Sequence, residues 1–138
     1  MKKLTKNNKG FSLIELIIVI AIMAVLVAII APNLTKYLGS SKKNTDSKNL
    51  DEIESTLKTC ITDYETSNGD LISVAGGTLT CAWSGGALTS TGDTTFDGIV
   101  NAAIDASKTT SKQDSTKNAK AIITKGADGT YSIAMSWA

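Results

Sequence analysis

The chain has 138 residues, 42% of them apolar and 20% charged, which is enough for one compact domain with an appended segment and too little for a second, catalytic domain. All 14 basic side chains are lysines, and the lack of histidine and arginine argues against an enzyme, so we expect no cofactor and no metal site. Residues 1–10 hold four lysines and no acid, whereas the remaining 10 lysines face 13 acids, so a nucleic-acid partner is not indicated.

The first predicted element is a helix that opens with an apolar stretch at residues 11–31. Only Ser12 and Glu15 interrupt its apolar character. At about 1.5 Å per residue, a helix of this length can cross the ~30 Å hydrocarbon layer of a membrane. The lysines in front of it predict a single-pass topology with the N-terminus in the cytoplasm and the C-terminus outside.

Three other interpretations of residues 11–31 are open. A secretory signal peptide has a shorter apolar core and a small-residue cleavage site, which Ala28 and Ala31 do not supply. A plain signal anchor, or a helix buried in a soluble core, fits the length but leaves Glu15 without a partner in an apolar environment. A correct interpretation of the segment therefore has to explain this carboxylate.

The same helix is predicted to continue beyond Pro32. The proline ring removes one helical hydrogen bond, so a kink or local melting is expected between Pro32 and Ser41. Further on, apolar residues recur every three or four positions and predict one buried helical face ending at about residue 66. This stripe consists of Leu50, Ile53, Leu57, Cys60, Ile61 and Tyr64.

The remainder of the chain predicts a small sheet and one short helix. The expected strands are residues 71–74, 78–83, 119–125 and 130–138. A helix is expected around residues 96–104, capped by Asp93, Thr94 or Thr95, and an exposed polar loop at 107–118. The predicted fold class is α+β. The apolar half of a long N-terminal helix is expected to protrude, and its outer half to pack on a small C-terminal antiparallel sheet, which gives a ladle-shaped molecule.

The two cysteines form a candidate disulfide. Cys60 lies on the helical stripe, and Cys81 alternates with Leu79 and Trp83 in a predicted strand. A Cys60–Cys81 bridge would tie the helix to the sheet outside the cytoplasm, where cysteines can oxidise. The alternative is two buried thiols that pack as small apolar residues.

Residues 9–15, Lys-Gly-Phe-Ser-Leu-Ile-Glu, carry a recognisable motif. Together with the short basic leader, the apolar helix and Pro32, they resemble the prepilin motif of type IV pilins and their relatives. In that family, a membrane-embedded aspartyl peptidase cuts after the glycine and methylates the new N-terminus. The resemblance therefore implies cleavage between Gly10 and Phe11 and N-methylation of Phe11.

The resemblance also implies a division of the chain and a role for the charged residue. It implies a cleaved leader at 1–10, a transmembrane and filament-core helix at 11–39, and a globular head at 40–138, made of an outer helix half at 40–67 and a sheet with loops at 68–138. Glu15 would neutralise the terminal amine of Phe11 on an adjacent subunit and fix the register. The alternative is that Glu15 complements the dipole of its own helix or folds back onto its own Phe11 amine.

The resemblance implies that the protein is a structural subunit of a type IV pilus. It would be made as a membrane precursor and polymerised through the apolar helix into an extracellular filament, which serves adhesion, motility or aggregation. Its implied partners are identical subunits, the prepilin peptidase and N-methylase, the pilus assembly platform, minor pilins and, before assembly, the membrane. Two alternatives stay open: a minor pilin or pseudopilin of a type II secretion or DNA-uptake system, and a membrane-anchored surface protein that never polymerises.

Overall fold

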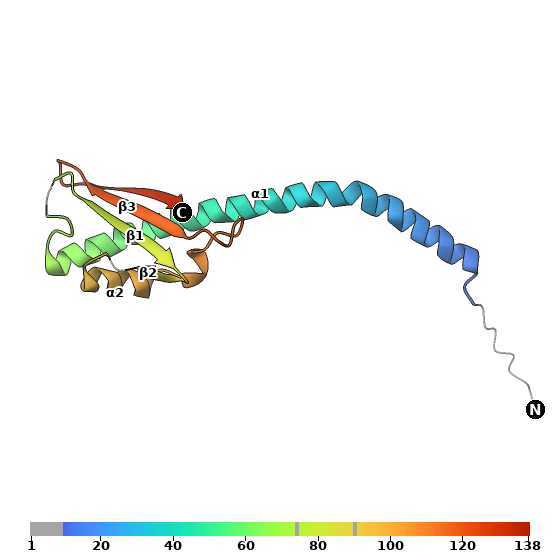
Figure 1. The fold of residues 1–138 in the computed structure, drawn as a ribbon, viewed down its shortest axis with the longest axis horizontal. Helices are drawn as coiled ribbons and strands as arrows, with labels where there is room; N and C mark the ends of the chain where they lie inside the picture. Colours follow the sequence, from blue (N-terminus) through green and yellow to red (C-terminus); the bar gives the residue numbers. More distant parts are fainter. Residues whose placement is uncertain (1–9, 74, 90) are drawn as a thin grey trace, which may run out of the picture. The chain divides into compact units, whose positions relative to one another are not determined.

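The computed structural model describes residues 10–73, 75–89 and 91–138, so the leader lysines lie outside the described residues. A long helix, α1 (Leu13–Asn68), precedes a four-stranded antiparallel sheet, and the predicted α+β class is confirmed (Figure 1). The chain divides into two compact units, one ending at Leu38 and the other comprising Gly39–Ala138. Each unit is described by itself below.

Helix α1 passes through Pro32 without a break. Residues 13–68 are all described and all helical, so the local melting expected between Pro32 and Ser41 is absent from this structure. A proline removes a single N–H, and only the carbonyl of Ala28 loses its helical partner. The neighbouring helical hydrogen bonds are sufficient to keep the segment in the α conformation.

The sheet has the strand order β2-β1-β3-β4. Its strands are β1 (Thr78–Ser84), β2 (Ala87–Thr89), β3 (Ala119–Lys125) and β4 (Tyr131–Trp137). Strand β2 was not predicted from the sequence. It follows Gly85 and Gly86, whose φ angles of 59° and 86° give the left-handed pair of turn residues that a tight hairpin requires.

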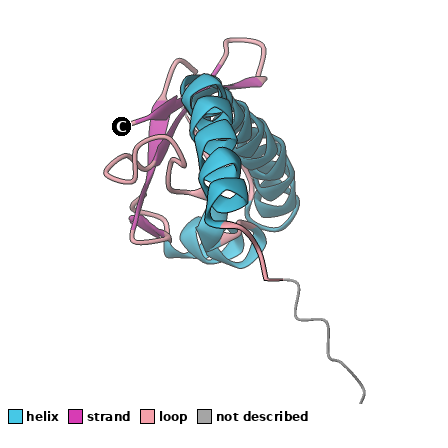
Figure 2. Ribbon diagram, turned by 90° about the vertical axis from the view of Figure 1, so that its right-hand side faces the viewer, coloured by secondary structure: helices cyan, strands magenta, loops and turns pink. Residues whose placement is uncertain are grey.

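The core of the C-terminal unit lies between the second half of α1 and one face of the sheet. Figure 2 shows the strands, in magenta, as one layer beside the helices. The predicted stripe supplies the helical side of this core, with Leu57 completely buried. Small side chains at Ala119 and Ala121, both 0% exposed, let β3 approach the helix closely. The buried apolar residues are Ile53, Leu57, Cys60, Ile61, Tyr64, Cys81, Trp83, Leu88, Phe96, Val100, Ala119, Ala121 and Ile123.

Helix α2 (Thr94–Ala103) completes this core, as predicted. Asp93 is its N-cap and accepts hydrogen bonds from the backbone of Thr95 and Phe96, each at 2.9 Å. The same carboxylate accepts a 2.6 Å bond from the Tyr64 hydroxyl, and the rings of Tyr64 and Phe96 meet edge to face with centroids 5.8 Å apart. A single aspartate therefore both starts α2 and joins it to α1.

The predicted strand at 71–74 is wrong for the residues that the structure describes. Residues 71–73 form no strand, and Val74 lies outside the described part of the chain. The N–H groups of Leu71 and Ile72 donate instead to the Glu65 carboxylate and the Tyr131 hydroxyl, each at 3.4 Å. Side chains from α1 and β4 thus accept the hydrogen bonds that a neighbouring strand would otherwise accept from these backbone N–H groups.

The predicted exposed loop at 107–118 is also corrected. It begins within a short 3-10 helix, η1 (Ala106–Lys108), and two of its residues are buried, Thr109 at 0% exposure and Ser111 at 5%. A bridge between Thr110 and Asn118 closes it. The segment is anchored to α1, by a contact described in the next subsection.

Candidate functional site

The predicted cleavage junction lies in non-helical backbone just before α1. Phe11 is 89% exposed, and Gly10 is exposed as well. A Cβ placed on Gly10 would meet nothing within 4 Å. No contact within the described chain therefore explains why this position is a glycine.

Glu15 lies in the first turn of α1 and acts there as a local cap. Its Oε2 atom accepts a 2.8 Å hydrogen bond from the backbone N–H of Ser12. With Ser12 preceding the first helical residue, this is one half of a capping box, in which a glutamate in the first turn satisfies the donor before the helix. The local alternative weighed from the sequence is thus present, with Ser12 rather than Phe11 as the donor.

The apolar stretch that follows is exposed along its whole length in the described part of the chain. Every residue from 10 to 45 is exposed, and the large apolar side chains of residues 11–31 retain between 44% of their surface, at Val19, and 89%, at Phe11. Among the described residues, α1 is the one helix long and apolar enough to cross a membrane by length and composition. A continuous apolar surface of this size requires lipid or other protein chains around it.

Pro32 completes the predicted assembly residues and is exposed within the same helix. The structure therefore places Gly10, Phe11, Glu15 and Pro32 in the same unit, which ends at Leu38. They do not converge on a pocket but follow one another along the chain. Such an arrangement suits recognition of an exposed segment and packing against other helices.

The predicted disulfide partners, Cys60 and Cys81, are both thiols in this structure and both belong to the core, with exposures of 2% and 0%. Burial raises the pKa of Cys60, as the charge of Asp63 also does. Burial, with Asp97 and Cys60 as further causes, raises the pKa of Cys81 to about 12. Both side chains belong to the same core cluster, and the bridge stays a prediction.

These thiols are expected to be unreactive in the folded protein. Burial limits access, and the raised pKa values keep the reactive thiolate scarce at neutral pH. Reduced protein should therefore take up iodoacetamide at neither cysteine when native and at both when unfolded in urea, as measured by intact mass. Rapid modification of the native protein would contradict this burial, and protein that is labelled in urea only after reduction would establish the Cys60–Cys81 bridge.

A residue that sequence reasoning missed holds the 107–118 segment in place. Asp46 on α1 is 4% exposed and accepts three hydrogen bonds, from the Ser111 hydroxyl at 2.5 Å and from the backbone of Lys112 and Gln113 at 2.6 Å and 3.1 Å. Burial alone would raise its pKa, but these hydrogen bonds lower it below the ordinary value. Asp46 lies four residues before Leu50 on the same helical face. This position is the one feature of the sequence that could have indicated a buried Asp46.

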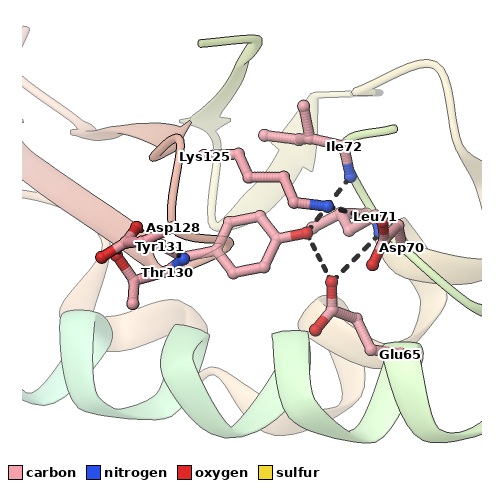
Figure 3. Close-up of polar contacts among 8 residues, drawn as sticks. All are labelled: Glu65, Asp70, Leu71, Ile72, Lys125, Asp128, Thr130 and Tyr131. Atoms are coloured by element: carbon pink, nitrogen blue, oxygen red, sulfur yellow. Dashed lines mark hydrogen bonds and ion pairs between the residues drawn. The ribbon is translucent and has the colours of Figure 1, made fainter. Parts of the chain in front are cut away.

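A second polar cluster holds the turn after α1 (Figure 3). The Glu65 carboxylate accepts a hydrogen bond from the Tyr131 hydroxyl, while Lys125 pairs with Asp70 at 2.6 Å. The Lys125 ammonium also lies 5.7 Å from the centre of the Tyr131 ring. These contacts join the end of α1 to the hairpin of β3 and β4.

The comparisons with known proteins match the N-terminal segment. The family model of the prokaryotic N-terminal methylation motif matches residues 5–31. Residues 5–31 thus carry a prokaryotic N-terminal methylation motif. This range includes Gly10, Phe11 and Glu15, and the resemblance to the type IV pilin family is confirmed by the motif and by relatives that carry pilin names.

Three relatives illustrate how far the similarity extends. The chain is 44% identical over 55 residues to "Prepilin peptidase-dependent protein A" of Clostridium perfringens, covering 38% of this chain and 39% of that protein. It is 38% identical over 58 residues to "Type IV major pilin protein PilA" of Myxococcus xanthus, covering 42% of this chain and 26% of that protein. It is 34% identical over 80 residues to "Type IV major fimbrial protein FimA" of Dichelobacter nodosus, covering 51% and 50%.

The matched part is thus half or less of each of these relatives. No solved structure matches the chain. The family model covers residues 5–31, and the matches to the relatives are longer, between 38% and 51% of this chain.

Proposed function

We propose that this protein is a structural subunit of a type IV pilus. The observation that carries the proposal is the uncovered apolar surface of residues 11–31, which directly follows the prepilin cleavage motif. In the precursor, membrane lipid covers this surface. After assembly, the same surface packs against copies of itself in the centre of a filament, and the hydrophobic effect supplies the cohesion in both states.

Processing after Gly10 separates these two states. The open surroundings of Gly10 support recognition from outside the chain, since a peptidase can bring its own groups close to a backbone that has no side chain. Removal of residues 1–10 eliminates four cytoplasmic lysines that oppose extraction from the bilayer. The printed name of the Clostridium relative, a prepilin peptidase-dependent protein, supports the same step here.

In the assembled state, Glu15 pairs with the methylated amine of Phe11 on a neighbouring subunit. Its Oε2 atom accepts from Ser12, and its Oε1 atom forms no hydrogen bond with the described part of the chain. One carboxylate can therefore cap its own helix and bind a neighbour's amine at the same time. A charge pair surrounded by apolar side chains fixes the axial register of the subunits more than it adds cohesion.

Mass spectrometry of material sheared from the cell surface tests the proposal. The expected result is an abundant product that begins with methylated Phe11 and contains the rest of the chain. Intact Met1 on a product that stays in the membrane would contradict polymerisation and favour a membrane-anchored surface protein. A processed product that is scarce in sheared filaments would instead favour a minor pilin or a pseudopilin.

Two substitutions at Glu15 separate the local cap from the pairing between subunits. Glutamine can still accept the Ser12 N–H and preserve the cap, but it carries no charge. We therefore expect Glu15→Gln and Glu15→Ala to lose filaments alike, at unchanged levels of membrane precursor, as measured by electron microscopy and immunoblotting. Normal filaments in Glu15→Gln, with loss in Glu15→Ala, would show that the cap alone matters.

A further inference from the structure

The C-terminal unit has an open groove on the side of α1 where the 107–118 segment is anchored. It has a volume of about 590 Å³, within the range of small-molecule sites. Its walls come from α1, from the anchored segment and from the end of β4. The lining residues are Lys43, Asp46, Ser47, Leu50, Ser111, Gln113, Asp114, Lys117 and Trp137.

Two of the residues that line the groove are apolar or aromatic. Trp137 is partly buried, packs on the edge of the core and contributes its remaining surface to the groove beside Leu50. A flat indole face with a partly exposed surface is suited to stacking against a ring that presents C–H groups. Water is displaced from both surfaces when such a ring binds.

The lining also carries hydrogen-bonding groups of both kinds. Lys43 and Lys117 are exposed donors, and neither forms an ion pair among the residues that the structure describes. The Gln113 side chain is exposed, while its backbone N–H donates a hydrogen bond to the Asp46 carboxylate. Asp114 lines the groove and accepts hydrogen bonds from Thr116 through Oδ1, and its Oδ2 atom forms no hydrogen bond with the described residues.

We propose that this groove binds an acidic saccharide, with one sugar ring against Trp137, its carboxylate between Lys43 and Lys117, and its hydroxyls on Gln113 and Asp114. The lining has no net charge, since Asp46 and Asp114 balance Lys43 and Lys117, but the Asp46 carboxylate is occupied by three hydrogen bonds within the chain, so the two lysines are the charged groups left to bind a carboxylate. The acceptors select a ligand that also has hydroxyl donors, because the Asp114 carboxylate would repel a plain anion. This site goes beyond the proposed subunit role and does not depend on polymerisation.

Asp46 builds the groove without serving as a ligand group. Its carboxylate is occupied by Ser111, Lys112 and Gln113, and these bonds place the Gln113 and Asp114 side chains along the rim. The groove is therefore held open by a buried anchor before any ligand arrives. Such preorganisation lowers the conformational cost of binding.

Binding is tested with the full chain in micelles of an amine-oxide detergent, which has no sugar headgroup. Digalacturonate and neutral cellobiose are titrated while tryptophan emission is recorded. Trp83 is 4% exposed, so a surface ligand reports through Trp137. We expect a saturable change for digalacturonate with a Kd of about 1 mM, and binding of cellobiose weaker by about tenfold.

Matched variants identify the site. Lys117→Gln and Gln113→Ala should each weaken digalacturonate binding by about fivefold to tenfold, whereas Lys120→Gln, the same charge change on β3 outside the groove, should leave it unchanged. The proposal would be overturned by any of three results: equal binding of both sugars, binding of inorganic sulfate as tight as that of digalacturonate, or no saturable change in emission. An emission change that appears on raising the protein concentration without sugar would also overturn it, because a second copy would then occupy the groove. The test runs on unassembled protein, so its failure leaves the pilus proposal standing.

Discussion

Replacement of Ile22 by lysine is expected to abolish filaments while the precursor still reaches the membrane. Ile22 lies in the middle of the apolar stretch and is 55% exposed. A lysine there costs about 3 kcal/mol on membrane insertion, which the remaining apolar residues of the segment outweigh, and its long side chain can reach toward the lipid headgroups. In a bundle of packed helices the ammonium reaches no water, so we expect assembly to fail.

Filament loss is measured by electron microscopy of sheared material, and precursor level by immunoblotting of membranes. Ile22→Leu is the matched control, because it keeps volume and hydrophobicity and should retain filaments. Filaments of normal abundance in Ile22→Lys would mean that residue 22 faces water in the assembled state. That outcome would remove the reason for placing this segment at the centre of the filament.

Replacement of Asp46 by alanine is expected to release the 107–118 segment from α1. The variant loses three hydrogen bonds to a buried carboxylate and leaves the Lys112 backbone N–H without its acceptor, while the Gln113 N–H keeps the Ser111 hydroxyl at 3.2 Å, so we expect a local cost of about 2 kcal/mol. A cost of that size raises the open population roughly 30-fold. Trypsin cleavage after Lys112 should accelerate by a similar factor.

The Asp46 effect has a control and a pH signature. Asp51→Ala removes an exposed aspartate from the same helix and should leave the cleavage rate unchanged. The folded pKa of Asp46 is lowered, so its contribution is present above the ordinary value of 3.8 and is lost as pH falls through the folded pKa. In urea unfolding, the difference between Asp46→Ala and the natural chain should shrink below pH 3.8. A difference independent of acid pH would contradict the anchoring role of the ionised carboxylate.

Local patterns in the sequence were sufficient to predict α1, α2, β1, β3 and β4. Apolar residues recur every three or four positions in the helices and every second position in the strands. The faces that they mark are packed against the core, as with Leu57 on α1 and Ile123 on β3. The predicted processing residues Gly10 and Phe11 and the predicted assembly residue Glu15 came from a contiguous motif and required no tertiary information. The Ser12–Glu15 cap is equally local and could have been predicted from the serine and glutamate three positions apart.

The contacts that could not be predicted connect distant parts of the chain. Asp46 and Ser111 are 65 positions apart, and Glu65 and Tyr131 are 66 positions apart. A polar residue at the end of an apolar stripe has the same local signature whether it faces water or anchors a loop. Strand β2 was missed because its three residues are too few to establish an alternation.

The central claim, that one apolar helix contacts lipid before assembly and other copies afterwards, is tested most directly by a benzophenone side chain at Ile22. Illumination of membranes should yield lipid adducts of the monomer, and illumination of sheared filaments should yield a ladder of multimers of this chain. Monomers alone after illumination of sheared filaments would contradict the account, because residue 22 would then have no neighbouring copy within reach.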